Sequence, residues 1–312
     1  MINIYKTEDG VLQELNEFIP GAWVHVSMPD DDDVTRIVEE LGVDPDYVRA
    51  ALDEEETPRV DSEEGDTLII VDIPVMEREK SNSSLLYSTL PLAIIHRQDM
   101  IITVCLRDTS LINMFKDGKV RGFNTVKKTR FILLLLQKNA ARYLTYLKHI
   151  DKTSVSIESE LHKSMQNREL IQMLALEKSL VYFSTSLTSN ERVLKKLLRL
   201  DFIQNYPDDT ELLEDLLVEN EQAINMCSIH RDILSGTMDA FASIISNNLN
   251  VVMKLLASIT IVLSIPTIVA SFFGMNTGVP FEGEPMGFYI VMAIACGFSI
   301  ITAIILWRKK MF

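Results

Sequence analysis

Glycine and proline are both missing from the middle of this 312-residue sequence. No glycine occurs between Gly122 and Gly236, and no proline occurs between Pro91 and Pro207. Glycine weakens a helix through its backbone entropy, and proline breaks one because it lacks an N–H. Their absence therefore predicts long, uninterrupted helices through the middle of the chain.

Cysteine is also scarce, with Cys105, Cys227 and Cys296 far apart in the sequence. An odd number of widely spaced cysteines suggests neither a disulfide framework nor a cysteine-based metal cluster. The sequence likewise lacks the phosphate-binding motif G-x-x-x-x-G-K-[ST] and any cluster of His and Asp typical of a hydrolase. We therefore expect a protein that is not an enzyme.

Positive charge is rare in the N-terminal part of the chain. Residues 1–80 hold 23 Asp and Glu against 6 Lys and Arg, whereas the net charge of the whole chain is −14. A nucleic-acid partner is not expected, because a phosphate backbone requires basic residues. Acidic runs of this kind are most often solvated surfaces, but they also offer the carboxylate oxygens that hard divalent cations prefer.

Two runs near the C-terminus lack charge altogether, over residues 255–273 and 287–307. Each is long enough to cross about 30 Å of hydrocarbon as a helix. A buried core helix is the alternative interpretation of such a run. Two of them, joined by a short polar corner, favour a membrane hairpin.

The basic residues around these runs predict the orientation of the hairpin. Lys254 precedes the first run, Arg308, Lys309 and Lys310 follow the second, and the connecting loop has none. By the positive-inside rule, both ends face the cytoplasm. The first 20 residues carry charges throughout, so we expect no cleavable signal peptide before Gly21. The prediction is a multi-pass protein of the plasma (inner) membrane with both termini in the cytoplasm.

Residues 1–122 show a mixed pattern of short elements. "WVHVSM" and "TLIIVDIPV" are typical of strands, and "LAIIHRQDMIITVC" is typical of two strands around a polar turn. "DVTRIVEELG" is typical of a helix that ends at a glycine. This pattern predicts an α+β cytoplasmic domain.

Long antiparallel helices are expected over residues 123–206. Residues recur there at alternating steps of four and three, which is coiled-coil-like spacing: Leu136, Ala140, Tyr143, Leu147, Ile150, Ser154, Ile157 and Leu161. A break is expected around "MQNRE", after which a second helix returns antiparallel to the first.

The remainder of the chain is expected to be a single long helix followed by the hairpin turn and a second span. No proline occurs between Pro207 and Pro266, so one helix is predicted over residues 210–273. The expected segments are a stalk helix at 207–254, a pore-lining transmembrane helix at 255–275, an external loop at 276–286, a second transmembrane helix at 287–307 and a basic cytoplasmic tail at 308–312.

One stripe of the first membrane run is polar or small. Its members recur at steps of three or four: Asn250, Met253, Ala257, Thr260, Ser264, Thr267 and Ser271. The stripe is either a packing interface between helices, since small residues allow close approach, or the wall of a water-filled pore. Asn250 at the inner end and Asn276 beyond the outer end favour the pore. Two helices per chain cannot enclose a pore, so a cyclic homo-oligomer is expected.

The residues around the polar corner resemble a known family. "GMN" at residues 274–276 directly follows the first run, and "NVVMK" at residues 250–254 precedes that run. Together with the short acidic loop and the basic tail, this pattern resembles the CorA family of magnesium transporters. The resemblance implies a funnel-shaped homopentamer in the lipid bilayer, with Mg²⁺ as the transported ion.

The resemblance also assigns roles by position. Asn276 forms a ring at the outer mouth, where Gly274 and Met275 shape the turn. The pore-side positions of the family correspond here to Asn250, Met253, Leu256 and Thr267. Ser264 falls where some members carry methionine, which implies a wider constriction; Thr260 and Ser271 complete the expected pore wall.

The chemistry of Mg²⁺ fits such a mouth, because this ion gives up its water shell reluctantly. A ring of amide and carbonyl oxygens can hydrogen-bond the water shell without replacing it. Glu282 and Glu284 beside the mouth are expected to raise the local cation concentration. An inside-negative potential contributes roughly 4.6 kcal/mol per 100 mV to the entry of a divalent ion, so passive, channel-like uptake suffices.

Regulation by cytoplasmic Mg²⁺, bound between subunits, is a further implication of the resemblance. Asp215 aligns with an acidic residue of that sensor, and an ordinary solvated helix residue is the alternative. The usual N-terminal partner of the sensor aligns with Ala50. The nearby acidic run offers other carboxylates: Asp53, Glu54, Glu55 and Glu56.

Two alternatives stay open. The same architecture carries zinc, cobalt or nickel in related proteins, although zinc transporters of this superfamily usually have Gly-Ile-Asn where Met275 stands here. The other alternative is a membrane-anchored sensor that conducts nothing. The polar stripe argues against the sensor, because its spans would need no Asn, Thr and Ser facing a common axis.

Overall fold

The structure is a computed structural model that describes residues 1–63, 65–78, 85–164, 167–204, 206–275, 278, 280 and 286–311. The predicted site residues Asn276, Glu282 and Glu284 lie outside these residues. The chain divides into two compact units, Met1–Gly236 and Thr237–Phe312.

The N-terminal unit contains a seven-stranded sheet in the order β2-β1-β3-β7-β6-β5-β4. The strands are β1 (Ile2–Glu8), β2 (Val11–Leu15), β3 (Trp23–Ser27), β4 (Arg59–Glu63), β5 (Asp66–Arg78), β6 (Leu85–His96) and β7 (Ile101–Cys105). Only β3 and β7 pair in parallel among these strands, and the other neighbours are antiparallel. A mostly antiparallel sheet with helices gathered beside it is an α+β arrangement, as predicted.

The helices differ widely in length, and the longest ones lie in the second half of the chain and just before it. The helices are α1 (Asp31–Leu41), α2 (Pro45–Arg49), η1 (Ala50–Leu52), α3 (Ser110–Lys116), α4 (Lys128–Ser164), α5 (Asn167–Leu197), α6 (Asp201–Gln204), α7 (Pro207–Phe273) and α8 (Gly287–Arg308). The absence of glycine and proline from the middle of the chain correctly predicted the long helices α4 and α5, which have 37 and 31 residues.

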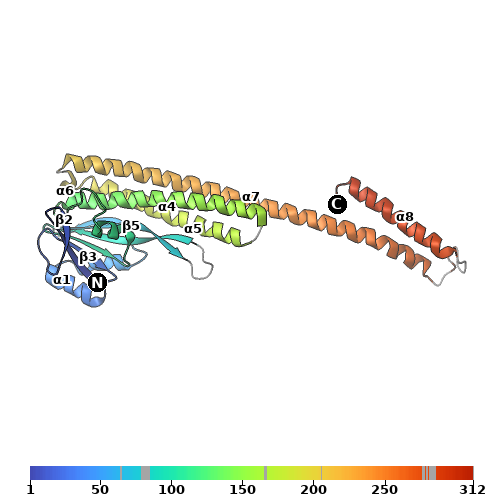
Figure 1. Ribbon diagram of the computed structural model, residues 1–312, viewed down its shortest axis with the longest axis horizontal. Coiled ribbons are helices and arrows are strands. Elements are labelled where there is room, and N and C mark those ends of the chain that lie inside the picture. Colours follow the sequence, from blue (N-terminus) through green and yellow to red (C-terminus); the bar gives the residue numbers. More distant parts are fainter. Residues whose placement is uncertain are drawn as a thin grey trace. The chain divides into compact units, whose positions relative to one another are not determined.

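Both faces of the sheet are covered. Residues of α1, α2 and η1 pack on one face, and α3 to α7 pack on the other (Figure 1). Successive residues of β5 alternate between the two faces, as this arrangement requires. Leu68 packs in the core beside α1, α2 and η1, and Ile69 packs in the core beside α3 to α7. Strands buried on both faces explain why the sequence of β5 and β6 is nearly continuous in apolar residues.

The helix predicted from "DVTRIVEELG" is α1, and its ends show why it forms there. Asp30 accepts a hydrogen bond from the Asp33 backbone, and the Asp33 side chain accepts one in return from the Asp30 backbone. This reciprocal pair satisfies two N–H groups that the first helical turn leaves free. At the other end, Gly42 adopts a left-handed conformation with φ of 65° and ends the helix.

The three long helices of the N-terminal unit alternate in direction. Two contacts between α4 and α7 join residues that are 79 positions apart, Arg130–Asp209 and Asp151–His230. A constant offset means that α4 and α7 run parallel. The opposite relation holds between α7 and α5, where Asn220 donates to the Leu187 carbonyl and Cys227 donates to the Leu180 carbonyl. Helix α5 therefore runs antiparallel to both.

The hairpin of β5 and β6 extends beyond its neighbouring strands. Strand β4 pairs with β5 only as far as Ile70, and β7 pairs with β6 only from Leu92 onward. Side chains of the long helices bond the backbone of this extension. The Asp72 N–H donates to Asn190 Oδ1, and the Asp72 carbonyl accepts from Asn190 Nδ2 at 2.8 Å and from Asn139 Nδ2 at 2.9 Å.

The other edge of the extension is covered in a similar way. The Tyr87 N–H donates to Ser179 Oγ at 2.9 Å, and the Ser179 hydroxyl donates to the Ala175 carbonyl of its own helix. Burial also raises the pKa of the Asp72 carboxyl above its usual value. The helices are thus fixed to the hairpin by hydrogen bonds as well as by apolar packing.

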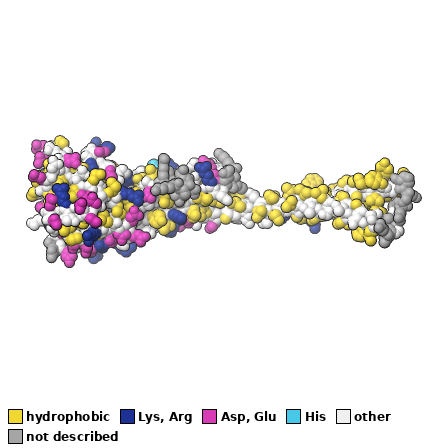
Figure 2. Space-filling model, turned by 90° about the horizontal axis from the view of Figure 1, so that it is seen from below, with side chains coloured by type: hydrophobic (Ala, Val, Ile, Leu, Met, Phe, Trp, Pro, Cys, Tyr) yellow, Lys and Arg dark blue, Asp and Glu magenta, His cyan; other side chains and the backbone are white. Residues whose placement is uncertain are grey.

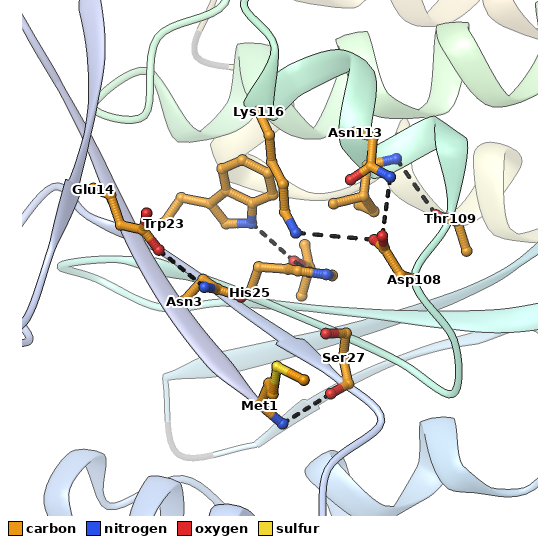
Figure 3. Close-up of polar contacts among 12 residues, drawn as sticks. Met1, Asn3, Glu14, Trp23, His25, Ser27, Asp108, Thr109, Asn113 and Lys116 are labelled. Carbon is orange, nitrogen blue, oxygen red and sulfur yellow. Dashed lines mark hydrogen bonds and ion pairs between the residues drawn. The ribbon is translucent and has the colours of Figure 1, made fainter.

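A histidine lies in the core of the same unit, among the residues drawn in Figure 3. Trp23 Nε1 donates to Thr103 Oγ1 at 2.8 Å, and that hydroxyl lies 3.0 Å from His25 Nδ1. Burial and the positive charge of Lys116 lower the pKa of His25 to about 3. His25 is therefore neutral, and its Nδ1 shares a hydrogen bond with the Thr103 hydroxyl.

The second unit holds the two apolar helical segments. On the face seen in Figure 2, hydrophobic side chains dominate these segments, whereas charged side chains crowd the N-terminal unit. Helices α7 and α8 are each long and apolar enough to cross a membrane, and most of their apolar side chains are exposed. A core helix of a soluble protein would bury such side chains, so exposure favours the membrane hairpin.

Candidate functional site

The candidate site is one face of α7 in the second unit. The covered residues of this segment follow helical spacing: Ser258, Val262, Ile265 and Val269 are buried or half-buried. They face α8, which is the other helix of the unit in the described part of the chain. At about 100° per residue, the centre of the predicted polar stripe lies about 140° from this covered face.

The stripe is accordingly exposed along its length. Its members are all exposed: Asn250, Met253, Ala257, Thr260, Ser264, Thr267 and Ser271. Leu256, which borders the stripe, is exposed as well. Thr260, Ser264 and Thr267 also line a shallow groove on this face, together with Leu263 and Ile268. Because the stripe points away from α8, packing within the hairpin does not account for its polar residues.

The hydroxyl groups of the stripe are oriented by their own helix. Thr260 donates to the Leu256 carbonyl and Ser264 to the Thr260 carbonyl, both at 2.8 Å, and Thr267 donates to the Leu263 carbonyl. Each proton is thereby directed at the helix backbone, which leaves the oxygen lone pairs free to accept. A row of acceptors faces outward along a surface that is otherwise apolar.

The inner end of the stripe is apolar. Met253 and Leu256 expose 56% and 57% of their surface, respectively, and follow the exposed Asn250 by one and two turns. Large apolar side chains that remain exposed in one hairpin need a covering surface or a narrow shared axis. The outward acceptors of the stripe therefore begin one turn beyond these two apolar residues.

The outer end of the site is the corner that follows α7. The Gly274 N–H donates to the Ala270 carbonyl at 2.9 Å, so the helical hydrogen bonds extend to this glycine. A Cβ added at Gly274 would lie 3.1 Å from the Ala270 carbonyl oxygen, which is tighter than ordinary contact. Glycine therefore suits this close turn. Met275 is exposed, and the residues assigned to the mouth and its acidic rim beyond it lie outside the described part of the chain.

The residues assigned to regulation are not brought together within one chain. Asp53 Oδ1 accepts from the Glu55 backbone, Glu54 pairs with Arg107 at 3.3 Å, and Glu56 pairs with Arg59. Asp215 lies exposed on α7. The described residues contain no group of three or more His, Cys, Asp or Glu side chains that could hold a metal ion. A sensor built from them would require carboxylates of a second subunit.

Sequence reasoning missed two sets of polar residues. Asn139 and Asn190 bond the Asp72 backbone across two helices and a strand, and no local motif indicates this. Ser258 was left outside the polar stripe, yet it is fully buried and donates to the Met311 carbonyl at 3.1 Å. The only signal for Ser258 was a hydroxyl on the face of the helix opposite the stripe.

Comparisons with known proteins identify the family. The family described as "CorA-like Mg2+ transporter protein" matches residues 21–310. The cobalt/magnesium transport protein CorA of Methanocaldococcus jannaschii is 27% identical over 87% of this chain and 85% of its own. The protein of the same name from Thermotoga maritima is 23% identical over 98% of this chain and 88% of its own.

The fold agrees with a solved relative. The complete structure of the CorA magnesium transporter from Methanocaldococcus jannaschii matches with a TM-score of 0.81 and 24% identity, and covers 99% of this chain and 96% of that one. The predicted order of an α+β domain, long helices and two C-terminal apolar helices is therefore confirmed. This chain belongs to the CorA-like family of Mg²⁺ transporter proteins, a family of ion transporters and not of enzymes.

Proposed function

We propose that this protein transports Mg²⁺ across the plasma (inner) membrane as a homopentamer, with the stripe of α7 from each subunit lining the pore. The observation that carries the proposal is the exposed row of hydroxyl acceptors directed away from α8. A central pore shared by several copies supplies the polar surroundings that this row needs. Both termini then lie in the cytoplasm, as the basic residues at Lys254 and Arg308 favour.

The chemistry of the stripe suits a hydrated cation. Water molecules around Mg²⁺ direct their oxygens at the ion and their hydrogens outward, so the pore wall must accept hydrogen bonds. Thr260, Ser264 and Thr267 do so because their own protons are held by the helix backbone. A wall of neutral acceptors lets the ion keep its water shell and move on, whereas carboxylates would bind it more tightly.

The mouth and the gate lie at the two ends of this wall. An amide ring of Asn276 selects the hydrated ion at the outer mouth, while Glu282 and Glu284 concentrate cations beside it. Met253 and Leu256 form an apolar constriction at the inner end, which closes by excluding water. Entry is driven by the membrane potential, worth roughly 4.6 kcal/mol per 100 mV for a divalent ion.

Intracellular Mg²⁺ regulates this pore through the acidic N-terminal unit. Carboxylates of neighbouring subunits repel one another, and a divalent ion between them favours the closed assembly. Asp215 and the acidic run from Asp53 to Glu56 are the candidate ligands. Two residues of that run, Glu54 and Glu56, pair with arginines, whereas Asp215 is exposed on α7.

The test is ion uptake by purified protein in liposomes with an imposed inside-negative potential. Mg²⁺ uptake is expected for the wild type and is expected to be lost in Asn276→Ala. Asn247→Ala is the matched control, because it removes the same amide from an exposed position of α7 outside the stripe. Near-normal uptake by Asn276→Ala would overturn the assigned mouth.

The same assay separates the alternative functions. Cobalt is the strongest second substrate, because both relatives are named cobalt/magnesium transport proteins. Uptake of Mg²⁺, Co²⁺, Ni²⁺ and Zn²⁺ is compared at equal concentrations, and Mg²⁺ is expected to be carried. Uptake of Zn²⁺ alone would make the protein a zinc transporter. If no ion is taken up, the remaining alternative is a membrane-anchored sensor that conducts nothing. Native mass spectrometry of the detergent-purified protein tests the pentamer.

A further inference from the structure

The segment that follows α8 forms a defined turn. The Met311 N–H donates to the Leu306 carbonyl at 3.1 Å, and the Lys310 N–H donates to the Trp307 carbonyl at 3.0 Å. These two nested bonds form a Schellman motif, which satisfies carbonyls at the end of a helix. Lys310 occupies its left-handed position with φ of 53°, where glycine is the usual residue. The turn sends the chain back across the end of α8.

The turn delivers a backbone carbonyl to α7. The Met311 carbonyl accepts a hydrogen bond from Ser258 Oγ at 3.1 Å, and Ser258 is fully buried. The hydroxyls of Thr260 and Ser264 on the opposite face donate instead to their own helix. Ser258 thus uses its hydroxyl to hold another segment of the chain.

The position of Ser258 connects this bond to the gate. Ser258 lies five residues after Met253 and two residues after Leu256, so at about 100° per residue it projects from the opposite side of α7. We propose that Ser258 and the Met311 carbonyl form a clasp that positions the inner end of α7 behind Met253 and Leu256. Ser258 is then a positioning residue for the gate, a role that rests on the proposed function.

The physical reason is the cost of an unpaired polar group away from water. A buried hydroxyl and a backbone carbonyl at the edge of an apolar hairpin both require partners. Each satisfies the other only while α7 and the turn after α8 stay in register. A displacement of the inner end of α7 away from α8 therefore breaks the clasp, and the clasp opposes that displacement.

The test measures the clasp and the gate separately in the full chain. Ser258→Ala removes the donor, Ser258→Thr keeps a hydroxyl, and Ser299→Ala is the matched control. Ser299 donates to the Ala295 carbonyl of its own helix, so its loss leaves the clasp intact. Hydrogen exchange of the backbone at residues 309–311 reports the turn, and liposome uptake against internal Mg²⁺ concentration reports the gate.

In Ser258→Ala, exchange at residues 309–311 is expected to rise about two- to tenfold, the range set by one net hydrogen bond. The same variant is expected to leak at internal Mg²⁺ concentrations that close the wild type. Ser258→Thr is expected to restore both readouts, and Ser299→Ala to change neither.

Each other outcome overturns a different statement. Unchanged exchange in Ser258→Ala means that the clasp does not form. Faster exchange with unchanged inhibition means that the clasp forms and does not position the gate. If the wild type carries no ion while Ser258→Ala still accelerates exchange, the proposed function fails and the clasp survives as a structural contact only.

Discussion

Polar side chains are used differently in the two units of this molecule. In the N-terminal unit, buried side chains such as Asn139 and Asn190 bond the backbone of a distant strand. In the second unit, Thr260 and Ser264 donate hydrogen bonds to the helix that carries them and expose their oxygens. The first arrangement fixes tertiary structure. The second leaves the fold to apolar packing and makes the hydroxyls available to whatever lies beside the helix.

The largest expected effect follows from removing a polar contact of the first kind. Asn190→Ala deletes both bonds to the Asp72 backbone and leaves the half-buried Asp72 N–H without this partner. We expect the N-terminal unit to lose about 3 kcal/mol of stability, since an unsatisfied buried group adds to the lost bonds. Thermal unfolding of the detergent-purified protein, followed by circular dichroism, measures the change.

Ser264→Ala is the comparison, because it deletes a bond within one membrane helix. We expect this substitution to change the free energy of unfolding by less than about 0.5 kcal/mol, and we expect the variant to differ from the wild type in its rate of ion uptake. Equal destabilisation by the two substitutions would contradict the difference between the units.

A pH titration sharpens the same comparison, because residues 237–312 contain no histidine. Burial, with Lys116 nearby, lowers the pKa of His25 to about 3, and burial, with Lys128 nearby, lowers the pKa of His96 to about 4. Below the ordinary value of 6.5, the unfolded state binds protons that the folded state does not. The N-terminal unit is therefore expected to lose stability as the pH falls from about 6.5 toward 4, by about 1.4 kcal/mol per pH unit for each histidine.

The variant His25→Gln tests that assignment, since it keeps an acceptor for the Thr103 hydroxyl and cannot be protonated. Its melting temperature is expected to depend less steeply on pH than that of the wild type. An identical pH dependence in wild type and variant would show that His25 does not contribute.

A smaller effect, on transport alone, is expected at the apolar inner end of the stripe. Met253→Ser replaces a large exposed apolar side chain by a hydroxyl, which favours water in the constriction. We expect a few-fold rise in Mg²⁺ flux, or weaker inhibition by internal Mg²⁺, with the N-terminal unit unfolding as in the wild type. Unchanged flux together with unchanged inhibition would place the gate elsewhere.

The smallest effect is expected at Asp215, one carboxylate of an acidic surface. Added Mg²⁺ is expected to protect the wild type from protease, and Asp215→Ala is expected to need about twofold more of the ion, because one ligand is lost and others stay. The measurement is protease resistance of purified protein against Mg²⁺ concentration. Coincident protection curves would make Asp215 an ordinary solvated residue.

Much of the fold could be predicted because its signals are local. The glycine at the end of "DVTRIVEELG" correctly marked the end of α1, which begins two residues before that stretch, at Asp31. The four-and-three spacing in α4 was correct, since seven of its eight positions are buried and Ser154 is half-buried. The lack of proline between Pro207 and Pro266 predicted one long helix where α7 lies, and two uncharged runs predicted the hairpin.

The remaining contacts could not be predicted, because they depend on residues far apart in the chain. Asn190 meets Asp72 across 118 positions, and Ser258 meets Met311 across 53. The clasp also requires Lys310 to adopt a backbone conformation that its side chain does not favour. In the candidate site, residue spacing in the sequence was enough to predict the stripe. That the stripe faces away from α8 could be learned only from the packing of the two helices in the structure.

The extension of the β5–β6 hairpin has a consequence for solubility. Unpaired strand edges are templates on which other chains add strands and aggregate. Here Asn190 occupies the Asp72 N–H on one edge, and Ser179 occupies the Tyr87 N–H on the other. Pro74 and Pro91, in the same extension, offer no N–H to an incoming strand. The long helices therefore cover both edges of the extension and prevent a strand of another chain from pairing there.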